Sequence, residues 1–196
     1  LADCLVQLGD VTGARAAYDA GLKLEHPPWL MVELQICVAE GRGEALLERW
    51  EGGSGEGSVA QVVELLFALG RHDEGEARAR TALGDPQEHE ADKLVVRLAL
   101  ADDLMRRGEA AQAVAILEPT PDHNVRFAVP KARALLGVGR TEDASTLLEP
   151  WATQGSVAPP EVRLVGAMAA KTAGRPFDRS SVEVIVPTPA WFQLDG

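Results

Sequence analysis

The sequence has few aromatic residues and no long hydrophobic run. Phe, Trp and Tyr make up 5% of its 196 residues. Ala and Leu must therefore provide most of the core, which favours closely packed helices over a β-rich fold. No apolar stretch approaches the ~20 residues that a membrane-spanning helix needs. With 46% hydrophobic residues, the chain can still bury a sizeable core in one elongated domain.

Positive charge is also scarce. The chain carries 19 Lys and Arg residues against 30 Asp and Glu residues, which gives a formal net charge of −11. A nucleic-acid-binding protein is expected to present a basic face, and anionic lipid attracts basic segments. We therefore expect neither nucleic acid nor a membrane among the partners of this protein.

Only two cysteines are present, Cys4 and Cys37. Each lies a few residues before a glycine, inside a segment that we expect to pack inward, where the two could approach each other. We interpret both as buried thiols that act as small hydrophobic residues. The cytoplasm is then the default compartment.

Sequence patterns typical of a metal or cofactor site are absent. Neither His-x-x-Glu-His nor Cys-x-x-Cys occurs, and the glycine-rich stretch 52–58 lacks the preceding strand and the Gly-Lys-Ser/Thr ending of a phosphate loop. We interpret that stretch as a flexible surface connection. The four histidines lie far apart at predicted turns or helix starts: His26, His72, His89 and His123. No cofactor and no metal are therefore expected.

Asp102 and Asp103 are the one suggestive pair of carboxylates. Adjacent residues on a helix point about 100° apart, so they cannot flank one substrate, and we interpret them as a solvated or groove-facing acidic patch. Ser145 and Thr146 fall in the middle of a predicted helix without a nearby base, and no Gly-x-Ser-x-Gly elbow occurs. We therefore expect that the protein is not an enzyme.

What the sequence does contain is a short repeat. Its clearest copy, residues 94–117, is a hydrophobic helix that Gly108 ends, followed by an Ala-rich helix with Ala113 and Leu117 five and nine residues after the glycine. Successive turn glycines are 29 to 38 residues apart, a period that indicates stacked helical hairpins. The other copies centre on Gly9, Gly41, Gly70, Gly139 and Gly174.

On these residues the chain resembles a tetratricopeptide repeat (TPR) protein, whose unit of ~34 residues is a helix, a turn and a second helix. The matching features are the turn glycine, a small residue five positions later and a bulky residue nine positions later. The second repeat has Leu46 and Trp50 at these positions, and the third has Gly75 and Ala79. The resemblance covers residues 1–175. It implies about five degenerate repeats plus a terminal helix, arranged as an all-α, right-handed solenoid of antiparallel helix pairs.

Proline, glycine and the hydrophobic pattern predict where each helix begins and ends. The predicted helices form a repeat domain over residues 1–175, and an extended tail follows at 176–196. The predicted helical ranges are 1–8, 11–24, 29–40, 43–51, 59–69, 73–84, 88–107, 109–118, 125–138, 141–152 and 160–173.

The tail differs in kind from the repeats. Val182, Val184 and Val186 alternate with other residues, and Pro187 and Pro189 exclude a regular helix, so an extended segment is predicted. We interpret it as a cap that covers the apolar end of the solenoid. It could instead be the first strand of a further domain, or an arm that docks on another subunit by strand addition.

In TPR proteins the first helix of each pair lines a concave face, where an extended peptide or a partner helix binds. The resemblance therefore implies that residues six, three and two positions before each turn glycine face a groove. Phe67 is the only aromatic residue among them, so we expect it to anchor the ligand. The principal groove residues are Gln35, Val38, Glu64, Phe67, Asp102, Met105, Arg106, Arg133, Leu136, Met168 and Lys171; Asp3, Val6, Gln7, Ala39, Ala68, Gly137 and Thr172 complete the set.

The function that the resemblance implies is a non-catalytic interaction module that binds a peptide or a helix of a partner protein. An alternative is the recruiting or regulatory arm of a larger enzyme whose catalytic domain lies outside this fragment. No signal peptide is visible, and Leu1 would fall partway along a first helix, so we expect the chain to be a piece of a longer protein. A third possibility is a scaffold that assembles through its exposed ends. The sequence leaves the oligomeric state open.

Overall fold

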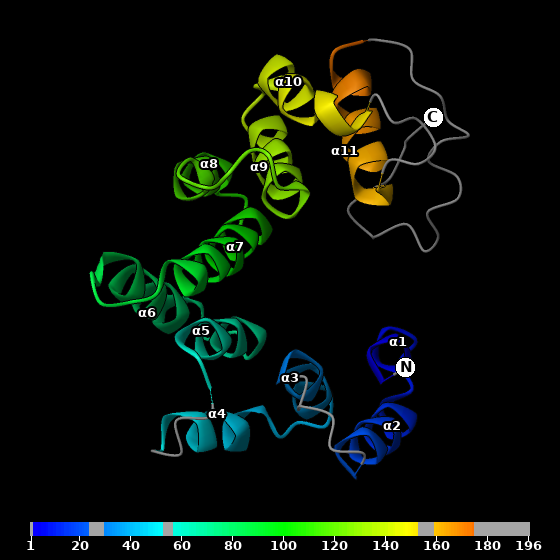
Figure 1. Cartoon of the computed structure of the whole chain (residues 1–196), viewed down its shortest axis with the longest axis vertical. Helices are drawn as coiled ribbons and strands as arrows, with labels where there is room; N and C mark the ends of the chain where they lie inside the picture. The colour runs from blue at the N-terminus through cyan, green and yellow to red at the C-terminus, as the bar shows by residue number, and fades with distance from the viewer. Residues whose placement is uncertain (1, 24–29, 53–56, 153–158, 175–196) are drawn as a thin grey trace. The chain divides into compact units, whose positions relative to one another are not determined.

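The computed structural model describes residues 2–23, 30–52, 57–152 and 159–174 (Figure 1). Within these ranges the chain is helical and contains no strand, which confirms the predicted all-α class there. The predictions for the tail at 176–196 lie outside the described residues. The helices are α1 (Ala2–Gln7), α2 (Val11–Lys23), α3 (Leu30–Ala39), α4 (Gly43–Glu51), α5 (Val59–Ala68), α6 (His72–Gly84), α7 (Glu90–Arg106), α8 (Ala110–Leu117), α9 (Val125–Gly137), α10 (Thr141–Ala152) and α11 (Pro160–Thr172).

The predicted helix limits agree with the observed ones to within two residues at every end. The largest difference is at α7, which begins at Glu90 rather than at residue 88. Local signals explain this agreement. Ser58, for example, caps α5 by accepting a hydrogen bond from the Gln61 backbone N–H, while the Gln61 side chain accepts one from the Ser58 N–H.

All six turn glycines adopt a left-handed backbone, with φ between 65° and 79°. At Gly70 the N–H of the glycine donates to the Phe67 carbonyl, and the next N–H, of Arg71, donates to the Leu66 carbonyl. This pair of bonds is the Schellman motif, and it recurs at Gly9, Gly41, Gly108 and Gly139. A side chain at such a position would strain the backbone, so the glycines stop each first helix and turn the chain into the second.

The chain divides into two compact units, Leu1–Leu100 and Ala101–Gly196, and the limit between them falls within α7. In the first unit each helix from α1 to α6 packs on the next, and α3 also contacts both α1 and α5. In the second unit α8 to α11 pack in sequence, and α9 also contacts α11 (Figure 1). First helices of neighbouring pairs are therefore in contact between α1 and α3, between α3 and α5, and between α9 and α11.

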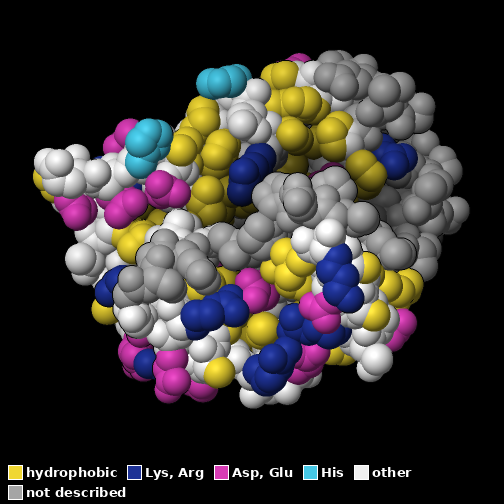
Figure 2. Space-filling model, turned by 60° about the horizontal axis from the view of Figure 1, so that its bottom comes forward, with side chains coloured by type: hydrophobic (Ala, Val, Ile, Leu, Met, Phe, Trp, Pro, Cys, Tyr) yellow, Lys and Arg dark blue, Asp and Glu magenta, His cyan; other side chains and the backbone are white. Residues whose placement is uncertain are grey.

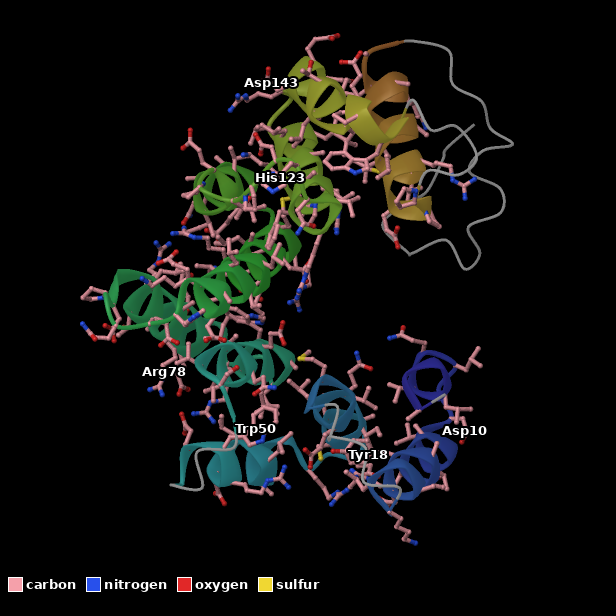
Figure 3. All side chains as sticks on the ribbon, in the orientation of Figure 1. Asp10, Tyr18, Trp50, Arg78, His123 and Asp143 are labelled. Carbon is pink, nitrogen blue, oxygen red and sulfur yellow. The ribbon has the colours of Figure 1, made fainter. Side chains whose placement is uncertain are left out.

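The positions five and nine residues after the first five turn glycines are buried, as the repeat predicts. At these positions no side chain is more than 8% exposed. Trp50 shows how they join one helix pair to the next: it points from α4 toward α5 (Figure 3) and belongs to a cluster with Leu46 and Leu65. The buried positions are Ala14, Tyr18, Leu46, Trp50, Gly75, Ala79, Ala113, Leu117, Ala144 and Leu148.

Ion pairs connect successive helices of the first unit. The Arg15 guanidinium of α2 donates to both carboxylate oxygens of Glu40, at 3.1 and 2.9 Å, and Arg42 donates to the same carboxylate. Arg49 of α4 pairs with the nearly buried Glu33 of α3 at 2.7 Å. Figure 2 shows dark blue basic side chains beside magenta acidic ones over the N-terminal helices.

We expect the Glu40 carboxylate to make stability depend on pH. Its hydrogen bonds from Arg15 and then Arg42 lower its pKa from 4.5 to about 2. Because the folded-state pKa is depressed, the stabilisation is complete above pH 4.5 and is lost as the pH falls toward 2. Glu40→Gln should cost about 1 kcal/mol of unfolding free energy at pH 7, and the difference from wild type should fall by more than half by about pH 3.

Urea denaturation of wild type and Glu40→Gln between pH 7 and 3 measures this effect. Arg15→Gln serves as the control, because it removes the cation and leaves the carboxylate in place. The prediction is contradicted if the difference in unfolding free energy between wild type and Glu40→Gln stays constant from pH 7 to pH 3.

Candidate functional site

The second unit has a surface hollow of about 500 Å³ on the side of its first helices. We call it the first-helix hollow. Three successive repeats contribute to it, through the end of α7, the end of α9 and the end of α11. Each of its seven lining residues is one of the groove residues that the resemblance implied from the sequence. They are Met105, Arg106, Arg133, Leu136, Gly137, Met168 and Thr172.

The repeated turn explains why these residues meet. The Met105 carbonyl accepts the Gly108 N–H at 3.1 Å, and the Leu136 carbonyl accepts the Gly139 N–H at 3.0 Å. Each residue therefore occupies the same place in the last turn of its helix. Since α9 also packs on α11, equivalent places on successive first helices lie on one face of the second unit.

Three half-buried apolar side chains line the hollow: Met105, Leu136 and Met168. Leu136 also packs against the core cluster that includes Leu135 and Val162. Gly137 lets the end of α9 lie close to α7 and α8, because a Cβ atom there would lie 2.7 Å from the Ala110 Cβ and 3.5 Å from the Met105 methyl carbon. The apolar part of the hollow is thus an extension of the core to the surface.

The polar part of the lining is basic. Arg106 and Arg133 line the hollow, and no acidic residue does. The Arg106 side chain is 54% exposed and pairs with Asp102 of its own helix at 3.3 Å. Lys171, another predicted groove residue, is exposed beside Thr172 but is not part of the lining.

The two adjacent aspartates of α7 differ from the predicted acidic patch. The Asp102 side chain is 55% exposed, as expected, but Asp103 is completely buried and pairs with the Nε of Arg107 at 3.1 Å. The rotation of about 100° between neighbouring helical residues turns one carboxylate outward and the other inward. The interpretation as a solvated pair is therefore wrong for Asp103.

In the first unit the predicted groove residues mainly contribute to packing. Val38 is half-buried against the cluster that contains Trp50, and Gln35 and Glu64 are half-buried on α3 and α5. Val6 packs in the same way against the N-terminal cluster. Gln7, Ala39 and Ala68 are exposed, and the side chain of Asp3 lies outside the described residues.

The prediction that Phe67 anchors a ligand also needs correction, because the side chain is buried in the structure. The side chain is 3% exposed, and its ring stacks on His72 with centroids 6.5 Å apart. A Cβ atom on Gly75 would lie only 2.6 Å from the ring. The glycine in the third repeat, where alanine is expected, therefore leaves room for this ring.

Sequence reasoning missed a second hollow of about 490 Å³, which lies over α8, α9 and α10. We call it the second-helix hollow. Lys131 pairs there with Asp122 at 2.7 Å, and Arg140 pairs with Asp143 at 2.6 Å. Exposed alanines on α8 were the available signal, since small residues on an outer face leave space. The lining residues are Ala111, Val114, Ala115, Glu118, Asp122, Lys131, Leu135, Arg140, Asp143, Thr146 and Leu147.

Other chemistry is limited in the part of the chain that the structure describes. No group of three or more His, Cys, Asp or Glu side chains there could hold a metal ion. Cys37 is a buried free thiol, as predicted, and the side chain of Cys4 lies outside the described residues. Burial, with a contribution from Glu33, raises the pKa of Tyr18 from 10 to about 12. None of the described helices is both long and apolar enough to cross a membrane.

Comparison with known proteins gives no family for this chain: no protein-family model matches it, and a search of curated proteins finds no match. Its function must therefore be inferred from the repeated turns, the first-helix hollow and the charges around it. The fold alone would not suffice, because one fold supports many functions.

Proposed function

We propose that this chain is a non-catalytic protein–protein interaction module of the TPR-like kind, and that it acts in the cytoplasm. Its helix pairs form a right-handed solenoid, and a peptide or helix of a partner protein binds in the first-helix hollow. Three features support the solenoid: the repeated left-handed glycines, the buried positions that follow them, and the contacts between first helices within each unit.

One observation carries the assignment of the site. Three successive repeats place residues of the same register around one hollow, where half-buried apolar side chains lie next to the exposed Arg106 and the half-buried Arg133. An apolar centre with a polar rim is the usual composition of a protein–protein interface.

Leu136→Glu is expected to weaken binding of the partner at least tenfold, about 1.4 kcal/mol, because it places a charge in the apolar part of the hollow. The partner is first recovered by affinity pull-down and its binding segment is mapped to a peptide. Titration calorimetry then compares wild type and variant.

Leu147→Glu is the matched control. Leu147 is also half-buried and packs against the same core cluster as Leu136, but it lines the second-helix hollow. Thermal denaturation of both variants separates lost binding from lost folding. Equal affinity of wild type and a folded Leu136→Glu variant would exclude the first-helix hollow as the binding site.

A further inference from the structure

We propose that the first-helix hollow selects an acidic partner segment that carries one large apolar side chain, preferably an aromatic one. Carboxylates of the segment would pair with Arg106 and Arg133, and its apolar side chain would lie against Met105, Leu136 and Met168. This inference rests on the proposed function and defines the chemical class of its ligand.

The charge of the hollow is opposite to that of the chain. Acidic residues outnumber basic ones by 30 to 19 overall, whereas the lining holds two arginines and no acidic residue. A guanidinium presents several N–H donors in a planar fork that matches a carboxylate. A segment with Asp or Glu residues would therefore be attracted to this site, whereas the rest of the acidic surface would repel it.

The ion pair between Asp102 and Arg106 does not remove the preference of the hollow for an acidic segment. Asp102 pairs with Arg106 at 3.3 Å, but both side chains are more than half exposed. Exposed pairs of this kind contribute little to stability, so a carboxylate of the ligand can share or replace this partner.

The apolar side of the hollow suits a large and variable side chain. Two of the three methionines of the chain, Met105 and Met168, line it. Methionine is unbranched and polarizable, so it adapts to different apolar shapes, and its sulfur makes favourable contacts with aromatic rings. Surfaces rich in methionine can therefore accept more than one apolar anchor.

The second-helix hollow supplies an internal comparison of nearly the same volume. Its lining holds three acidic residues, Glu118, Asp122 and Asp143, against two cations, Lys131 and Arg140. An acidic segment therefore finds no excess of positive charge there. The two hollows differ in charge more than in size, which assigns the acidic ligand to the first-helix hollow.

The test is selection of a displayed library of random 12-residue peptides on the whole chain. Recovered peptides are sorted by whether Leu136→Glu abolishes their binding. Those that depend on Leu136 should be enriched in Asp and Glu around one aromatic or large aliphatic residue. For these peptides, the double variant Arg106→Gln with Arg133→Gln should weaken binding about tenfold or more in fluorescence anisotropy, and should reduce the dependence of affinity on salt.

Arg126→Gln is the matched control, since Arg126 is exposed on α9 but does not line the hollow, and it should change affinity less than about twofold. If the peptides that depend on Leu136 are neutral or basic, or ignore the arginine variants, the acidic ligand class is wrong and the proposed function stands. If no recovered peptide depends on Leu136, the proposed function fails together with this inference.

Discussion

Replacing Phe67 by Ala is expected to lower the free energy of unfolding by about 3–5 kcal/mol. The ring is 3% exposed, stacks on His72 and fills the space beside Gly75. Removing the ring loses the free energy that its burial contributes, and it leaves a cavity between α5 and α6 that the rigid helices cannot close. Urea denaturation followed by circular dichroism measures the loss, and Phe67→Leu should cost less because it fills part of the space.

A second substitution tests whether Gly75 is the partner of this ring. Gly75→Ala should destabilise the wild type by about 1 kcal/mol, because the clash of the new Cβ with the ring outweighs the better helix propensity of alanine. In the Phe67→Ala background the same change should stabilise by about 1 kcal/mol. The two sites would then be coupled by about 2 kcal/mol in a double-mutant cycle. Additive effects would show that the ring and the glycine are not in contact.

These expectations for Phe67 differ from its predicted role as a binding anchor. The register correctly assigned Phe67 to the last turn of a first helix, at the same place as Met105 and Leu136. Register alone does not reveal whether a neighbour leaves room for the side chain. At Phe67 the missing Cβ of Gly75 admits the ring into the core, while Met105 and Leu136 stay half-buried at a hollow.

The helices could be predicted closely because their limits depend on local chemistry. A glycine with a left-handed backbone ends each first helix, and the bonds it makes involve only the preceding turn. The positions of the residues that line the first-helix hollow follow from the same spacing of the turn glycines. The burial of Asp103 and the second-helix hollow could not be predicted in this way. Both depend on how each helix is rotated against its neighbours and on how far apart the outer faces of neighbouring helices lie.

Ala113→Leu is expected to destabilise the second unit by about 1–3 kcal/mol. Ala113 is completely buried at the position five residues after a turn glycine, where four of the five repeats carry a small residue. Leucine adds three carbon atoms, and close-packed helices can admit them only by moving apart or by forcing the side chain out of its preferred rotamers. The change in the free energy of unfolding is measured by urea denaturation at pH 7.

The control is Ala115→Leu, which makes the same change on the same helix at an exposed position. It should alter stability by less than about 0.5 kcal/mol, because the new side chain extends into the open second-helix hollow and displaces no packed residue. Ala144→Leu repeats the test in the next hairpin, where the alanine is again completely buried. The prediction fails if the Ala113→Leu and Ala115→Leu variants are equally stable. That result would mean that the small residue does not set how closely the helices pack. The register that places Met105, Leu136 and Met168 around one hollow would then lose its physical basis.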